Sequence, residues 1–262
     1  MKNAILYRLQ EAIEFPQVAH EYRAPEGNEW RTVTFYNQAK DWMIARITER
    51  VLPSAAIKRF VAMKAAEFVE QNGQKANRTQ KAIWKDEYVE TNLPNAPMKD
   101  VFVSLYHNKD YLFVGTGSQA IADLVTSELR HNIFDGDLKI MLCNDDRRIS
   151  AFLRGVMDGN TGYALGDNFK FEHDNRKISF TGEMAESLAI DFYEAHNPRP
   201  VQVQFAAHDR HLIATLNEKG RFGGLTYDTE EGEDEPAKLF LTASALDELG
   251  NIMDECYEDN TL

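Results

Sequence analysis

Cysteine is almost absent from this sequence, and long apolar runs are missing. The two cysteines, Cys143 and Cys256, are too few for a disulfide framework, and their spacing is not typical of a zinc site. We therefore expect two free, buried thiols in a reducing compartment. No stretch reaches the roughly 18 apolar residues of a membrane-spanning helix. Charged residues follow the first apolar run too soon for a secretory leader, so the chain is expected to be cytoplasmic.

Positive charge is also scarce. The 262 residues carry 29 Lys and Arg against 42 Asp and Glu, which gives a formal net charge of −13. This balance argues against a uniformly basic nucleic-acid binder, although a local cluster of cations can still bind. With 43% hydrophobic residues, the chain is long enough to bury a sizeable core.

The apolar patterns predict an α+β fold of antiparallel sheets with long helices. Strands are expected at 4–9, 31–37, 41–49, 138–144, 176–180 and 220–228, and at the start of 237–260; hairpins are expected at 100–117 and 201–217. Helices are expected at 54–73, about 75–91, 118–133, 145–159 and 181–197, and in the rest of 237–260. The expected helix boundaries are N-caps at Ser54, Ser118 and Thr181, an end at Gly73, and a stop at Pro94 and Pro97.

These elements suggest three lobes within a single chain. An N-terminal lobe of sheet and helix is expected over about 1–52 and 98–165. A helical basic arm would span 53–97, and a C-terminal α+β lobe would span 166–262. No low-complexity linker separates them into independent domains.

One motif resembles a nucleotide site. Gly115-Thr-Gly-Ser-Gln-Ala120 matches G-x-G-x-x-A, follows an apolar strand and precedes a helix. The incoming strand, however, is the second arm of a hairpin, and the regular βαβ alternation of a dinucleotide fold is missing. We interpret the motif as a tight turn between strand and helix, and we expect no cofactor.

Metal and nucleophile chemistry have little support. His208 and His211 fall in a turn between strands and are interpreted as a solvated hairpin tip. The acidic run "EEGEDE" is expected to be a solvated loop. No carboxylate spacing resembles a metal-dependent nuclease, and no G-x-S-x-G is present. We therefore expect no catalytic or metal-binding residues and no enzymatic activity.

The cations are concentrated in one segment. Residues 57–85 hold seven cations against two anions, a net charge of +5, so the rest of the chain carries −18. At about 100° per residue, those of 75–85 fall within an arc of roughly 120° on a helix. Such a face suits contact with phosphates, although solvated basic faces are also common. The seven cations are Lys58, Arg59, Lys64, Lys75, Arg78, Lys81 and Lys85.

Several segments resemble the RdgC family of recombination-associated proteins. They are, in order, "KNAILYRL", "VLPSAAIKR", "QKANRTQKAIWKDE", "LPNAP", "RRISAFLRGVMDG", "RKISFTGEMAE", "VQVQFAAHDRHLIATLNEKGRFGGLTYD" and "KLFLTASALDELGNIMDE". Each match is short, but together they run through nearly the whole chain in the same order.

The resemblance implies a non-enzymatic, sequence-nonspecific binder of double-stranded DNA. It implies a ring-shaped homodimer with the duplex in a positively lined hole, restraint of the RecA recombinase, exonuclease inhibition and a nucleoid location. By resemblance, DNA contacts would come from the seven cations and from Arg176 and Lys177. The chain is shorter than typical bacterial members, as in a variant carried by a phage or mobile element. Compared with the family, the aromatic that closes the ring is replaced around Pro97, and Pro97 and Met98 become the candidate dimer contact.

Two other functions stay open at this stage. The acidic segments "TEEGEDE" and "DECYEDN" would suit an inhibitor that binds a DNA-processing enzyme, either as a DNA mimic or as an anti-defence protein. A nuclease is the third hypothesis. DNA binding by the isolated protein would favour the DNA-binding function over the inhibitor. Metal-dependent cleavage of DNA would favour the nuclease.

Overall fold

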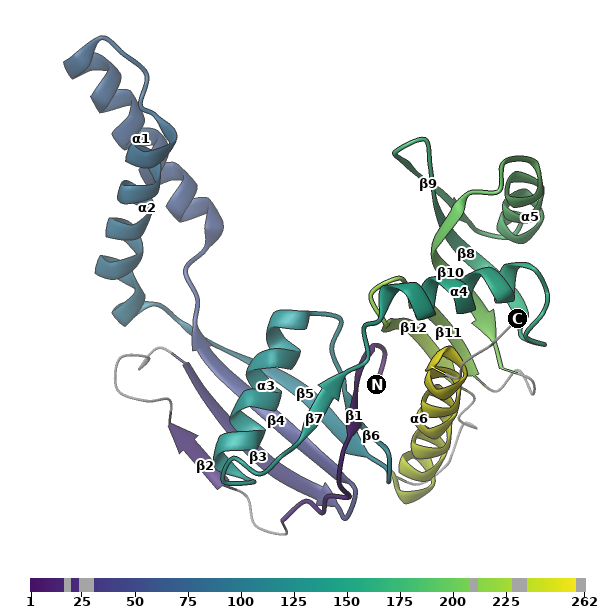
Figure 1. The fold of residues 1–262 in the computed structure, drawn as a ribbon. Helices are drawn as coiled ribbons and strands as arrows, with labels where there is room; N and C mark the ends of the chain where they lie inside the picture. The colour runs from purple at the N-terminus through teal and green to yellow at the C-terminus, as the bar shows by residue number, and fades with distance from the viewer. Residues whose placement is uncertain (17–19, 24–30, 208–211, 228–234, 258–262) are drawn as a thin grey trace. The chain divides into compact units, whose positions relative to one another are not determined.

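The computed structural model describes residues 1–16, 20–23, 31–207, 212–227 and 235–257 and combines helices with antiparallel strands (Figure 1). This is the α+β class that the sequence predicts. The chain divides into two compact units. Unit 1 comprises Met1–Val18, Asn37–Ile44 and Val103–Leu262, and unit 2 comprises Ala19–Tyr36 and Ala45–Phe102. Strands β3, β4 and β5 contribute residues to both units.

The sheet of unit 1 is antiparallel and is built around its first strand. Strand β1 (Ala4–Leu9) pairs with β6 (Tyr111–Val114), β7 (Ile140–Leu142) and β12 (Arg221–Tyr227). Beyond β12 the order is β11 (Leu212–Asn217), β10 (Arg199–Ala206), β8 (Ala164–His173) and β9 (Arg176–Thr181). The helices of this unit are α3 (Gln119–Asn132), α4 (Asp146–Met157), α5 (Ala185–His196) and α6 (Glu235–Tyr257).

One face of this sheet forms the core of unit 1, because its side chains alternate with period two. Val203, Phe205 and Leu216 have no exposed surface, whereas Gln202 and Gln204 on the opposite face are partly exposed. The helices cover the apolar face. Helix α4 adds five buried side chains, and α6 adds Leu246, Leu249, Ile252, Met253 and Cys256. On β10 the opposite face is therefore polar, whereas at β6 all four residues, on both faces, are buried.

Unit 2 combines a sheet with a helical hairpin. Its strands are ordered β2 (His20–Arg23), β3 (Arg31–Ala39), β4 (Trp42–Arg50) and β5 (Met98–His107). Between β4 and β5 the chain forms α1 (Ser54–Asn72) and α2 (Arg78–Asn92), followed by the short 3-10 helix η1 (Leu93–Asn95). Figure 1 shows α1 and α2 running side by side.

Most of the predicted elements are confirmed, and four details are wrong. Thr181 does not cap a helix, because it ends β9 and α5 begins only after Met184. Ser54 is the first residue of α1 and not its cap. Residues 237–241 are not a strand, because α6 is continuous from Glu235. Helix α2 begins at Arg78, so Lys75 precedes it. Strands β2 and β8 were not predicted.

The two cysteines are free and buried, as predicted. Burial raises the pKa of the Cys143 thiol to about 12, so this thiol stays protonated and unreactive at neutral pH. Among the described residues, no helix is both long and apolar enough to cross a lipid bilayer.

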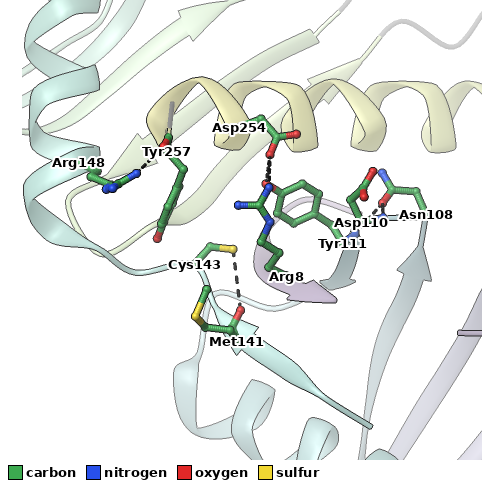
Figure 2. Close-up of polar contacts among 9 residues, drawn as sticks. All are labelled: Arg8, Asn108, Asp110, Tyr111, Met141, Cys143, Arg148, Asp254 and Tyr257. Atoms are coloured by element: carbon green, nitrogen blue, oxygen red, sulfur yellow. Dashed lines mark hydrogen bonds and ion pairs between the residues drawn. The ribbon is translucent and has the colours of Figure 1, made fainter. Parts of the chain in front are cut away.

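Helix α6 is joined to the sheet of unit 1 by a polar contact at Asp254 (Figure 2). The buried Tyr111 hydroxyl donates to Asp254 Oδ1 at 2.6 Å, and Arg8 Nη2 donates to the same oxygen at 3.1 Å. Burial, and then the hydrogen bond to Asp254, raise the pKa of the Tyr111 phenol above its ordinary value. Further along, Arg148 Nη1 donates to the Tyr257 carbonyl at the end of the helix. These contacts fix the position of α6 on the sheet.

We expect Asp254→Ala to lower the free energy of unfolding by about 1–3 kcal/mol, because the buried Tyr111 hydroxyl loses its acceptor. Urea denaturation measures the change. Asn251→Ala, on an exposed position of the same helix, is the matched control and should change stability by less than about 0.5 kcal/mol. Equal effects of the two substitutions would contradict the anchoring role of Asp254.

Candidate nucleic-acid interface

The helical hairpin of unit 2 is defined by signals at its bend. Helix α1 ends at Gly73, whose φ of 69° is left-handed and whose N–H donates to the Val69 carbonyl at 2.8 Å. Helix α2 begins with a capping box. The Asn77 side chain accepts from the Gln80 N–H at 2.8 Å, and the Gln80 side chain accepts from the Asn77 N–H at 3.1 Å. The bend is therefore set locally by residues 73–80.

Aromatic pairs hold the two helices together. The rings of Phe60 and Tyr88 lie 4.8 Å apart, and those of Phe68 and Trp84 lie 5.9 Å apart. No residue of α1 or α2, all of which are described, is buried. Because little apolar surface is hidden, these ring contacts contribute much of what stabilises the hairpin. The consequence for function is that both faces of the hairpin are open to other molecules.

One face of the hairpin is an apolar groove with a cationic rim. The groove has a volume of about 680 Å³. Its apolar lining consists of Ile57, Val61, Ala62, Ala65 and Ala82, and its charged lining consists of Lys58, Arg78, Lys81 and Lys85. None of the described residues that line it is acidic. The fold thus brings a cation of α1 together with three from α2.

The remaining cations of the basic segment lie elsewhere. Arg59 lines a second groove of about 480 Å³, together with Phe60, Met63 and Tyr88. Lys64 forms an ion pair with Glu67 at 3.6 Å and lies over the Phe60 ring. Lys75 is exposed in the bend. The prediction that Lys75 shares one helix face with the cations of α2 is therefore wrong. Lys58 of α1 lies beside those cations instead. Sequence spacing within one helix could not reveal this pairing.

Arg176 and Lys177 are exposed at the start of β9 in unit 1, whereas the hairpin belongs to unit 2. They follow a tight turn in which Asp174 and Asn175 both have positive φ values of 50° and 60°. Lys177 faces Glu172 on the neighbouring strand, so its charge is partly offset.

The candidate dimer contact also lies in unit 2, directly after the helical hairpin. Pro97 and Met98 are exposed where η1 leads into β5, and Met98 is 59% exposed. Phe102, on the same face of the strand, is 63% exposed. Asp100 lies between them and accepts from Arg46 and from the Thr48 hydroxyl, each at 2.6 Å. The hydrogen bond from Arg46 lowers the pKa of the Asp100 carboxyl. The surface therefore offers two apolar side chains on either side of a carboxylate that is paired with an arginine.

The structure places the Gly-x-Gly motif between a strand and a helix. The Gly115–Ala120 segment follows β6, which pairs antiparallel with β1 and β5, and it leads into α3. This matches the interpretation as a structural turn. His208 and His211 lie outside the described residues, as do residues 230–234 of the acidic run 230–235. Within the described part of the chain, no three His, Cys, Asp or Glu side chains are placed to hold a metal ion together.

Comparisons with known proteins point to one family. The family model described as "Putative exonuclease, RdgC" matches residues 17–174, a range that includes the whole hairpin. The chain is also similar to "Recombination-associated protein RdgC" of Proteus mirabilis (strain HI4320), with 31% identity over 130 residues. That match covers 48% of this chain and 42% of the relative, so the chain matches less than half of the relative's length.

The cap at the bend can be tested directly. We expect Asn77→Ala to destabilise α2 by about 1 kcal/mol, because the Gln80 N–H loses the Asn77 side-chain acceptor of the capping box. Amide hydrogen exchange should accelerate in the first turn of α2. Gln74→Ala, an exposed change in the same bend, should leave exchange unaltered. Unchanged exchange in Asn77→Ala would show that the cap does not hold the bend.

Proposed function

The chain belongs to the RdgC family, and from this we propose that it binds double-stranded DNA without sequence preference and acts in homologous recombination without catalysing a reaction. The observation that carries the proposal is the rim of Lys58, Arg78, Lys81 and Lys85, gathered from two helices around one groove. The distribution of charge also supports the proposal, because these cations are gathered in one place although the chain as a whole carries a net charge of −13.

The rim is suited to phosphate contact and not to base recognition. Residues three or four apart on a helix lie about 5–6 Å apart, so Arg78, Lys81 and Lys85 form a row. Long, exposed cations in a row can follow the phosphates of a duplex strand. Such contacts fix the position of a protein on DNA and carry no sequence information. The apolar floor of the groove offers few groups that could read base edges.

A single hairpin would bind weakly, because it offers few phosphate contacts. A second copy would double them, and two linked sites bind far more tightly than either alone. We propose a homodimer whose contact includes Pro97, Met98 and the neighbouring Phe102. Closure of this dimer into a ring around DNA, with Arg176 and Lys177 as additional contacts, is part of the same proposal. DNA held in this way would be less accessible to a recombinase or an exonuclease.

We predict that replacing Lys58, Arg78, Lys81 and Lys85 together with Gln lowers the affinity for a duplex at least about 30-fold at low salt, because four phosphate contacts are lost. Fluorescence anisotropy of a labelled duplex measures this. The matched control replaces Lys40, Lys109, Lys139 and Lys219 with Gln, which changes the net charge equally at exposed positions of unit 1.

The control variant should bind within about threefold of the wild type. Equal losses in both variants would show that net charge matters and the rim does not. Failure of the wild type to bind, combined with a stable complex with a nuclease or recombinase, would favour the acidic inhibitor instead. Cleavage of the duplex in Mg²⁺ or Mn²⁺ would contradict the non-enzymatic part of the proposal.

The dimer has its own test. We expect Met98→Asp to shift the protein toward monomer, because a charge would be buried in an apolar contact. Light scattering across a concentration series gives the dimer dissociation constant, which should rise at least about tenfold. Met184→Asp, at a methionine that is 69% exposed in unit 1, is the control. A monomeric wild type, or equal dimerisation of both variants, would overturn this contact.

A further inference from the structure

A polar pocket lies on the sheet of unit 1, apart from the basic hairpin. It has a volume of about 280 Å³. Strands β8, β10, β11 and β12 supply most of its lining, on the face opposite the core. The lining residues are Asn3, Gly117, Asn168, Gln202, Gln204, Thr215, Asn217, Arg221, Phe222, Gly223 and Gly224. None of these described residues is a carboxylate, and five of them carry a side-chain amide.

The amide oxygens are largely used within the protein. Gln204 Oε1 accepts from the Asp167 N–H at 2.8 Å. Asn217 Oδ1 accepts from the backbone N–H groups of Lys219 and Arg221 at 2.9 and 3.3 Å. Because each oxygen is held by a main-chain donor, the orientation of each amide is fixed. The NH₂ groups of Gln204 and Asn217 are consequently the ends left to interact with something else.

The same polarity holds on β8 and β10. Gln202 Oε1 accepts from Lys170 Nζ at 3.2 Å, and Gln202 Nε2 donates to Asn168 Oδ1 at 3.0 Å. This chain of hydrogen bonds leaves the Asn168 NH₂ group as a donor. It also brings the Lys170 ammonium group next to the pocket. The pocket is therefore rich in hydrogen-bond donors and poor in acceptors.

Arg221 adds a cation that has no carboxylate partner in the described part of the chain. Its Nε atom is buried and makes no hydrogen bond to the protein. A buried donor without an acceptor is unfavourable, and a water or an ion is one of the partners that can satisfy it. The β11–β12 turn fixes the position of this residue. Gly220 has a φ of 70°, and a Cβ there would lie 2.0 Å from the Cys143 carbonyl oxygen.

We propose that this pocket binds a phosphate group, with the Arg221 guanidinium and the amide NH₂ groups as its donors. A guanidinium fork matches two phosphate oxygens, and neutral amide donors complete such a site without acceptors that would repel an anion. The volume lies at the lower end of the range for small-ligand pockets, so there is room for a phosphate group. The phosphate could belong to a nucleic-acid backbone or to a free phosphate compound.

The direct test is a calorimetric titration of the protein (residues 1–262) with inorganic phosphate at constant ionic strength. The wild type should bind phosphate saturably. Arg221→Gln should weaken this binding at least about tenfold, and Arg221→Lys, which keeps the charge but loses the fork, should weaken it less. Lys219→Gln is the matched control, because it removes an exposed cation two residues away and should bind as the wild type does. Thermal melting checks that the variants are folded.

Duplex binding by the same variants distinguishes the two sources of phosphate. A loss of duplex affinity in Arg221→Gln, beyond that in Lys219→Gln, assigns the pocket to the nucleic-acid backbone. Unchanged duplex affinity with lost phosphate binding assigns it to a free phosphate compound. Absence of phosphate binding by the wild type, or equal binding by the wild type, Arg221→Lys and any folded Arg221→Gln, overturns the proposal. The phosphate titration does not involve the hairpin, so its result is separate from that of the hairpin variants.

Discussion

Electrostatic repulsion is the constraint on which the functional account depends. A chain with a net charge of −13 repels polyanions over most of its surface, so contact with DNA requires cations gathered in one place. The hairpin meets this requirement because it buries none of its residues and therefore exposes long cations from both helices. Aromatic contacts between Phe60 and Tyr88 and between Phe68 and Trp84 hold the helices together without covering those cations.

Much of the fold was predictable, because its signals are local. Strand β10 alternates apolar and polar residues, and Gly73 ends α1 at a left-handed φ. The errors arose where a short pattern fits two structures. The apolar run at 239–241 suits a strand or a helix, and the continuation of α6 decides it. Strand β8 was missed because Gly166, Asp167 and Asn168 in its first half are residue types typical of turns.

The candidate sites were predictable to different degrees. The basic segment is visible in the sequence as a charge count, but the rim is a tertiary feature, because Lys58 joins Arg78, Lys81 and Lys85 only when the hairpin folds. The pocket around Arg221 had no sequence signal. Its residues come from separate strands, and its donor character depends on which amide oxygens are held by backbone groups. Only the hydrogen bonds of the folded sheet reveal that polarity.

If the rim of the hairpin contacts DNA phosphates as proposed, duplex affinity must depend on salt through these four cations. The most direct measurement is the dependence of duplex affinity on salt, plotted as the logarithm of the binding constant against the logarithm of salt concentration. Each lost phosphate contact reduces the slope by about 0.9. We expect neutralisation of Lys58, Arg78, Lys81 and Lys85 to reduce the slope by about 3–4 per binding hairpin. An identical slope for the wild type and the rim variant would contradict it.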